Sequence, residues 1–465
     1  MLALVALLWL SGCATYSDNV KSAHSAVASN QPEKAVLLLN EQLETQSSAQ
    51  LPDSLDEDRP LLLLERAMVL QAMGEYKLAS RDMMAADDSL EWLDLTNAES
   101  MELAKYMYSE AAEDYRAPAY ERLLLNTLNM INFMAMDDIQ SAKVEARRFT
   151  LLEQFFLDEE QQEVLHGVLG VGNYVGAAAF EAANDYEMAA RYYSRAWYYG
   201  VRGQGFRQRL VDLLTLTGYK PRELQADDKE ALSDILEQVS LNQLITFEEY
   251  RQRHRNGDTL IVVQTGLAPW LEPKHIPIST AIGYTERAHR HSFDNDQQDR
   301  LNLMVANGVI DSVNFPMLTR RGTPSAKPVQ VRVGEHLIEP NADVDIASQV
   351  ETAYAEIMPS MMVAAITRLI TRAAAGSVTE AAVNHGGGGS GLGSLAGLAV
   401  KAGMNAADKP DTRSWMTLPA RMQLIRVQLG ADTHTISVEV GKKTDKRDVV
   451  IDQHSVNVMN FSRLR

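Results

Sequence analysis

The pattern of apolar residues changes near residue 250. Before that point apolar side chains recur every three or four positions, as on one face of a helix, and Leu63, Ala67 and Leu70 are an example. From Asp258 onward the spacing becomes that of strands. Residues 260–263 form a short continuous apolar run, and residues 329–333 alternate apolar with polar side chains. The pattern therefore predicts a helical half followed by a β-rich half.

Four short windows in the helical half share one pattern, a small or polar turn followed a few positions later by alanine. The windows are residues 30–35, 74–79, 137–142 and 184–189. Their alanines lie 44, 63 and 47 residues apart, whereas a regular tetratricopeptide array repeats about every 34 residues. We expect residues 13–250 to form a degenerate, interrupted tetratricopeptide-like α-solenoid.

A solenoid of this type lines its concave surface with the first helix of each pair. The turn positions place nine residues on that side, and a mostly apolar surface that carries methionine suits a bound peptide or helix. These residues are Leu64, Met68, Gln71, Thr127, Ile131, Met134, Tyr174, Ala178 and Glu181. The alternative is that irregular repeats curl tightly and bury these side chains as ordinary core.

The second half, residues 251–465, predicts an antiparallel β-rich, sandwich-like domain with a helical insertion at about residues 348–407. The predicted strands cover residues 259–263, 329–333, 336–338, 422–429, 435–440, 449–451 and 456–458. The insertion contains a run of glycines, Gly386–Gly391. No lysine follows at the spacing of a phosphate loop, since the next one is Lys401. We interpret the run as a connector between two closely packed helices. A secondary hypothesis is that these two helices contact a membrane or a partner.

The N-terminal residues have the pattern of a bacterial lipoprotein signal. Nine apolar residues, 2–10, precede Ser11, Gly12 and Cys13. Such a run is too short to span a bilayer but fits a secretory signal, and the ending resembles a lipobox. No lysine or arginine precedes the run, which departs from the usual signal. We expect residues 1–12 to be a signal peptide and Cys13 to carry palmitate-type acyl chains. Ala14 in place of aspartate predicts the outer membrane, facing the periplasm.

Charge and composition restrict the function further. Apolar residues at 46% and charged residues at 23% exclude collagen-like, disordered and multi-span membrane classes. The net charge of -18 argues against nucleic-acid binding, which needs a basic surface. The charge is uneven, with 41 acidic and 20 basic residues up to residue 250, and 21 and 24 after it. A single cysteine excludes internal disulfides and CxxC metal or redox sites.

Candidate catalytic and metal motifs are incomplete. His289 and His291 could share one side of a strand, but no third metal ligand is spaced to join them. A calcium-like loop begins at Asp294, yet Asp299 occupies the position that needs glycine. The Glu99-Ser100 pair lacks the signature that follows it in lytic transglycosylases. With no paired acid and base, we expect no catalysis, no cofactor, no metal and no small-molecule substrate.

Several segments together resemble a family of uncharacterised bacterial lipoproteins. They are residues 120–126, 144–148, 265–269 and 411–415 with Leu418-Pro419. The resemblance implies a tetratricopeptide-like half before a β-containing half. It also implies work in the cell envelope, because members are often encoded beside an outer-membrane activator of penicillin-binding proteins. From the residues themselves, Asp411 can pair with Arg413, and Trp415 should anchor the junction after the insertion.

Three functional hypotheses follow. The first is a lipid-anchored periplasmic scaffold or adaptor, without catalysis, that binds other cell-envelope proteins through its helical-repeat surface, with proteins of peptidoglycan synthesis as possible partners. The second is a structural subunit of an envelope-spanning assembly. The third is an enzyme that acts on peptidoglycan or polysaccharide. The sequence favours the first of these.

Overall fold

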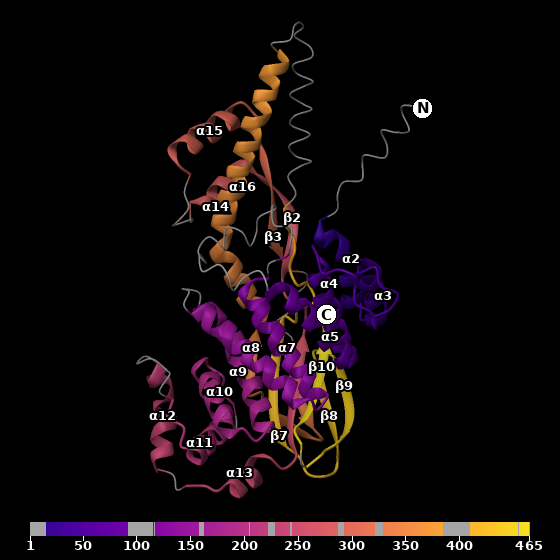
Figure 1. The fold of residues 1–465 in the computed structure, drawn as a ribbon, viewed down its shortest axis with the longest axis vertical. Coiled ribbons are helices and arrows are strands. Elements are labelled where there is room, and N and C mark those ends of the chain that lie inside the picture. The colour runs from indigo at the N-terminus through magenta and orange to yellow at the C-terminus, as the bar shows by residue number, and fades with distance from the viewer. Residues whose placement is uncertain are drawn as a thin grey trace.

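A computed structural model describes residues 15–91, 115, 117–157, 162–203, 205–221, 228–241, 244–286, 293–320, 329–384, 410–453 and 455–464. The chain is α+β: helices occupy the first part, and strands begin at residue 258 (Figure 1). The helices before the first strand are α2 (Tyr16–Ala28), α3 (Pro32–Gln42), α4 (Arg59–Met73), α5 (Tyr76–Glu91), α7 (Ala119–Ala135), α8 (Ile139–Leu157), α9 (Gln162–Ala182), α10 (Tyr186–Tyr198), α11 (Phe206–Thr217), α12 (Asp228–Leu241) and α13 (Phe247–His254).

Each of the four windows found in the sequence forms the turn of a helical hairpin. One residue in each turn has left-handed backbone, with φ of 58° at Asn30, 85° at Gly74, 59° at Asp137 and 59° at Asn184. Glycine, asparagine and aspartate tolerate this conformation, which ends one helix and lets the chain reverse. The alanines after these turns are fully buried; they are Ala35, Ala79, Ala142 and Ala189. Local turn chemistry therefore predicted these hairpins correctly.

The strands among the described residues form two four-stranded sheets and a two-stranded ribbon. They are β1 (Asp258–Thr265), β2 (Trp270–Pro277), β3 (Ser312–Thr319), β4 (Val329–Val333), β5 (His336–Ile338), β6 (Ala342–Asp345), β7 (Arg421–Gln428), β8 (Thr433–Val440), β9 (Lys443–Val450) and β10 (Asn457–Arg463). We call β10-β1-β7-β6 the inner sheet and β5-β4-β8-β9 the outer sheet. The inner sheet is mixed, because β1 pairs with β10 in parallel, which corrects the expectation of a purely antiparallel domain. Parallel pairing is possible because these two strands are joined by a long crossover rather than by a hairpin turn.

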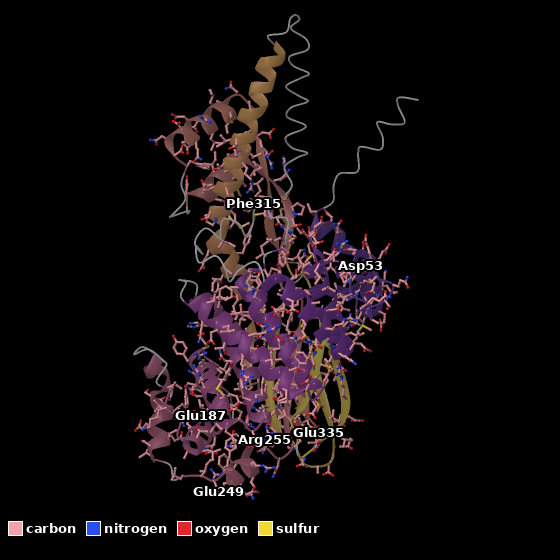
Figure 2. The ribbon with its side chains drawn as sticks, viewed as in Figure 1. Asp53, Glu187, Glu249, Arg255, Phe315 and Glu335 are labelled. Carbon is pink, nitrogen blue, oxygen red and sulfur yellow. The ribbon has the colours of Figure 1, made fainter. Side chains whose placement is uncertain are left out.

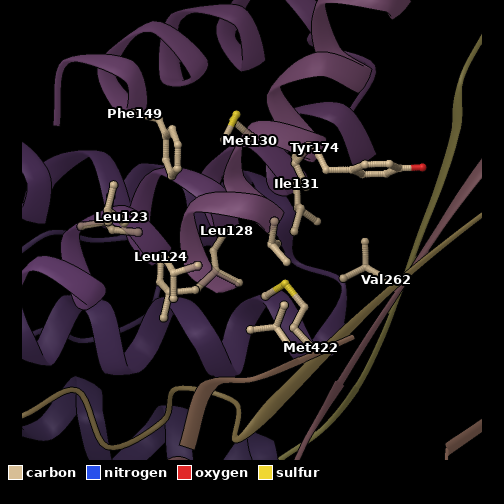
Figure 3. Packing of buried hydrophobic residues seen from close by; sticks show 14 of the residues in the cluster. Leu123, Leu124, Leu128, Met130, Ile131, Phe149, Tyr174, Val262 and Met422 are labelled. Atoms are coloured by element: carbon tan, nitrogen blue, oxygen red, sulfur yellow. The ribbon is translucent and has the colours of Figure 1, made fainter. Parts of the chain in front are cut away.

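The inner sheet is the middle of three layers. Leu260 and Val262 of β1 belong to the same hydrophobic cluster as the helices, and Figure 3 shows Val262 and Met422 opposite Leu128 and Ile131 of α7. On the other face, Ile261 of β1 packs in a second cluster with residues of the outer sheet. A strand covered on both faces has no solvent side, and this explains the continuous apolar run at residues 260–263.

A third hydrophobic cluster lies in an arm that projects from the body (Figure 1). The arm consists of β2, β3, α14 (Ile278–Thr285), α15 (Asn295–Ala306) and α16 (Ile346–Asn384). Phe315, labelled in Figure 2, is 1% exposed in this cluster. Residues Ile346–Arg372 of α16 are long and apolar enough to cross a membrane by length and composition, and half of the most apolar stretch is buried inside the protein. A core helix meets the same criterion.

The sequence missed most of the arm. The predicted insertion at residues 348–407 corresponds to α16 up to Asn384, and residues 385–409, with Gly386–Gly391, lie outside the described residues. The ribbon of β2 and β3 was not predicted. Proline normally argues against a strand because it cannot donate to the ladder. Here Pro273 of β2 faces Pro316 of β3 in a two-stranded ribbon, where no other described strand pairs with either one.

Candidate functional site

The residues predicted to line a partner-binding groove are buried. Leu64, Met68, Thr127, Ile131 and Glu181 are 0% exposed. Tyr174 is 1% exposed and Met134 is 2% exposed, and Gln71 and Ala178 are buried as well. An open groove on this side of the helices is therefore wrong. The alternative, that these side chains are core, describes them correctly.

The chain's own inner sheet covers this side of the helical layer. Helices α4 and α7 lie against β10, and α9 lies against β6. The amide of Gln71 donates to Asn132 in α7 at 2.8 Å and accepts from the side chain of Gln264 in β1, also at 2.8 Å. The surface that the sequence predicted to bind a partner is thus covered by residues of the second half.

Glu181 belongs to a buried ion network between the helices and the inner sheet. Arg209 of α11 donates to Glu181 at 2.8 Å and to Asp258 of β1 at 3.1 Å. Arg426 of β7 donates to Asp258 at 2.8 Å and lies 3.0 Å from the second oxygen of Glu181. The hydroxyl of Tyr250 also donates to Glu181, at 2.6 Å. Two arginines therefore tie a helix residue and a strand residue into one cluster.

The two carboxylates of this network remain ionised. Burial by itself raises the pKa of both Glu181 and Asp258. The adjacent guanidinium groups of Arg209 and Arg426 outweigh burial and hold both pKa values below their ordinary range. Removal of either arginine would leave the two buried carboxylates to share the other one, and breaking a buried ion pair is strongly destabilising in proteins.

A second pair of buried carboxylates holds the segment after the arm. Glu65 of α4 accepts the backbone N–H groups of Met416 at 2.7 Å and Thr417 at 2.9 Å. Glu121 of α7 accepts the backbone N–H of Trp415 at 3.0 Å. Burial raises the pKa of each carboxyl to about 7, although these hydrogen bonds oppose the shift. The two glutamates fix the entry of the chain into β7.

The segment at residues 411–418 behaves as its residues suggested. Trp415 is 1% exposed, in agreement with a junction anchor. Arg413 pairs locally with Asp411, at 3.0 Å and 2.6 Å from its two oxygens, and reaches Asp58 at 3.7 Å. The hydroxyl of Thr412 accepts the backbone N–H of Ser17 at 3.1 Å. This segment therefore joins α2 and α4 to the inner sheet.

The remaining sequence candidates fall in two groups. Cys13, Glu99-Ser100, and the pair His289 and His291 lie outside the described residues. Asp294 is the N-cap of α15 and accepts the backbone N–H of Gln297 at 2.7 Å, so the calcium-like start is a helix cap. Within the described ranges, no group of three or more His, Cys, Asp or Glu side chains is placed to hold a metal ion.

Sequence reasoning missed the residues of both buried networks. Glu65 and Glu121 each stand next to an arginine inside a helix that is mostly apolar, residues 61–70 and 119–128. A charge inside such a stretch is a signal, because charged side chains are rarely buried unless they are paired or hydrogen-bonded. Arg209, Asp258 and Arg426 carry no comparable local signal.

No protein-family model, curated protein or solved structure matches this chain.

Proposed function

We propose that the protein is a lipid-anchored scaffold or adaptor of the periplasm, held at the outer membrane through Cys13, that binds other cell-envelope proteins without catalysis. The lipobox-like ending at residues 10–13 supports the anchor. We also infer that the helical hairpins form a degenerate tetratricopeptide-like solenoid wrapped around a two-sheet sandwich. The four matching turns and the shared core between the two sheets support that assignment.

One observation carries the scaffold proposal: the arm has its own hydrophobic core and extends beyond the body (Figure 1). The concave side of the helices is filled by the inner sheet, so a partner must bind elsewhere. An extension with its own core adds exposed surface while keeping a defined shape. We therefore assign partner binding to the arm in place of the helical groove.

The first described helix, α2, lies at the end of the body from which the arm projects (Figure 1). Helix α2, which begins three residues after Cys13, packs against the base of the arm, and the rings of His24 and Trp270 lie 4.3 Å apart. Figure 1 shows α2 at the end of the body from which β2 and β3 project. Acyl chains on Cys13 would hold the base of the arm at the membrane surface, close to other membrane-anchored proteins.

Site-specific crosslinking in living cells tests this assignment. A photoreactive amino acid is placed at Leu303 on α15, which is 65% exposed, or at Leu37 on α3 in the body, which is 67% exposed. We expect position 303, and not position 37, to give a product that contains a different envelope protein, identified by mass spectrometry after purification under denaturing conditions.

The other outcomes contradict the proposal in distinct ways. A product that contains a second copy of this chain favours the structural subunit of a larger assembly. Equal products at positions 303 and 37 indicate random collision, and no product at position 303 argues against binding by the arm. Incubation of the purified protein with peptidoglycan, followed by mass spectrometry, separately tests the enzyme hypothesis, and released fragments would overturn the absence of catalysis.

A further inference from the structure

A cavity of about 250 Å³ opens where α11, α13 and β7 meet, beside the ion network of Glu181 and Asp258. Its lining includes Tyr174, Gly205, Arg209, Arg253, His254 and Arg426. We propose that this cavity binds the oxyanion group, a phosphate or a carboxylate, of a small molecule. This inference is independent of the scaffold function.

The charges around the cavity favour an anion. Among its described lining residues every charged side chain is basic. Arg209 contacts Glu181 and Arg426 contacts Asp258, and Arg253 lies 3.4 Å from Asp212. Arg255, which lies 3.8 Å from Asp258, adds a further guanidinium group to this cluster. A bound anion would accept hydrogen bonds from the N–H groups of these arginines that face the cavity.

The first turn of α11 adds to this positive potential. The helix begins at Phe206, and its N-cap is Gly205, with φ of 79° and no side chain to cap the helix. Gly205, Phe206, Gln208 and Arg209 all line the cavity. The N-terminal end of a helix carries a partial positive charge and backbone N–H groups that suit phosphate or carboxylate oxygens.

Tyr174 provides an independent sign of a missing partner. Its side chain is 1% exposed, lines the cavity, and extends from α9 toward the strands (Figure 3). Its ring packs edge-on against Tyr193 and Phe206. Its hydroxyl has no hydrogen-bond partner among the described residues, whereas the large majority of buried polar groups have one. Burial raises the pKa of Tyr174, so this hydroxyl stays protonated and able to donate to a ligand oxygen.

The size of the cavity limits the ligand. Pockets for drug-sized molecules measure roughly 300–1,000 Å³, so a cavity of about 250 Å³ suits a small metabolite with one or two oxyanion groups. Because the lining comes from α9, α11 and α13 on one side and from β7 on the other, the ligand would bridge the helical layer and the inner sheet.

Isothermal titration calorimetry on the full mature chain at low ionic strength tests the site, with inorganic phosphate and succinate as separate probes. We expect saturable binding of one or both, and the tighter probe distinguishes a phosphate ligand from a carboxylate ligand. Tyr174→Phe keeps the ring packing and removes only the hydroxyl, and the loss of one hydrogen bond should weaken binding about five- to tenfold.

Two arginine variants on α13 form a matched pair. Arg253→Gln removes a lining guanidinium and should weaken binding at least about tenfold, as for a charged hydrogen bond. Arg251→Gln removes the same charge at an exposed position outside the cavity and should change binding less than about twofold. The melting temperature of Tyr174→Phe checks that its fold is intact. No saturable heat with either anion, or equal losses in the two arginine variants, would overturn the proposal.

Discussion

The buried carboxylates of this protein are satisfied in two different ways. Glu181 and Asp258 face arginines and stay charged, because the guanidinium groups compensate for burial. Glu65 and Glu121 face mainly backbone N–H groups and hydroxyls, and burial raises the pKa of each to about 7. A hydrogen-bond donor without a formal charge offsets only part of the cost of burying a carboxylate. The two pairs should therefore respond differently to pH.

Glu121 provides a test of this difference. Its pKa is about 7 in the folded protein against an ordinary 4.5, so between these pH values the folded state holds more protons than the unfolded state. Stability therefore falls as pH rises through this window, by up to about 3 kcal/mol for a shift of this size. Glu121→Gln can still accept the N–H of Trp415 and donate to the hydroxyl of Tyr115, but it does not titrate.

Urea denaturation at several pH values measures the effect. We expect Glu121→Gln to lose stability less steeply than the wild type from pH 4.5 to 7, and to match or exceed it at pH 8. Glu33→Gln, at an exposed position on α3, is the control and should keep the wild-type slope. An unchanged slope in Glu121→Gln would mean that this carboxyl does not titrate in the window.

Cys13 is the residue on which anchoring depends. Each buried CH₂ of an acyl chain contributes about 0.8 kcal/mol, so two or three chains make release from the membrane negligible. We expect Cys13→Ser to abolish palmitate labelling and to leave a precursor that is not cut before residue 13. Ser11→Ala, which keeps a small residue in the lipobox-like ending, is the control and should still be labelled. Palmitate incorporation into Cys13→Ser would contradict the lipoprotein assignment.

At the scale of elements, two glycines in turns differ in how closely other atoms approach the position that a Cβ would occupy. Gly257 precedes β1 with φ of 60°, and a Cβ there would lie 1.8 Å from the carbonyl oxygen of Leu429. Gly218 ends α11 with φ of 65°, and a Cβ there would meet nothing within 4 Å. At both positions a residue other than glycine would be strained by the left-handed backbone, but only at Gly257 would its Cβ also collide with a neighbouring atom. The turn at Gly257 brings α13, β1 and the end of β7 together.

These two glycines form a matched pair of substitutions. We expect Gly218→Ala to cost about 1 kcal/mol in free energy of unfolding, the strain of a left-handed L-residue. Gly257→Ala should cost at least about twice as much, because the backbone must shift and weaken the 3.0 Å hydrogen bond from Leu429 N–H to the Gly257 carbonyl. Urea denaturation measures both. Equal losses would show that the end of β7 moves away without cost.

At the scale of the whole molecule, the two halves of the chain share one core. Met68 and Ile131 of the helices lie in the same cluster as Val262 and Met422 of the inner sheet. The ion network of Glu181 and Asp258 also crosses this boundary. The change of pattern near residue 250 therefore marks a change of secondary structure inside a continuous hydrophobic core.

Separate expression of the halves tests this. Residues 14–250 alone would expose the apolar side that the inner sheet covers, so we expect a helical fragment that binds a hydrophobic dye and aggregates. Co-expression with residues 251–465 should restore a soluble complex, detected by size-exclusion chromatography, and should remove the dye signal. A monodisperse 14–250 fragment that melts cooperatively without its partner half would show that the helical layer is an independent domain.

The sequence by itself determined the local features of this protein. The hairpin turns at Asn30, Gly74, Asp137 and Asn184 were predictable, because turn chemistry and helical spacing act over a few residues. The strand predicted at residues 259–263 lies within β1, Asp258–Thr265, and was predictable for the same reason. Local patterns also indicated the buried junction at Trp415.

Only the tertiary structure decided what covers each apolar face. Periodicity shows that one side of a helix is buried but does not identify the surface that buries it, and so a face filled by the inner sheet was predicted to be a partner groove. The parallel pairing of β1 with β10 and the contacts of Arg426 with Glu181 join residues that are far apart in the chain. Such contacts form when layers pack, and no local pattern encodes which distant residue will be the partner.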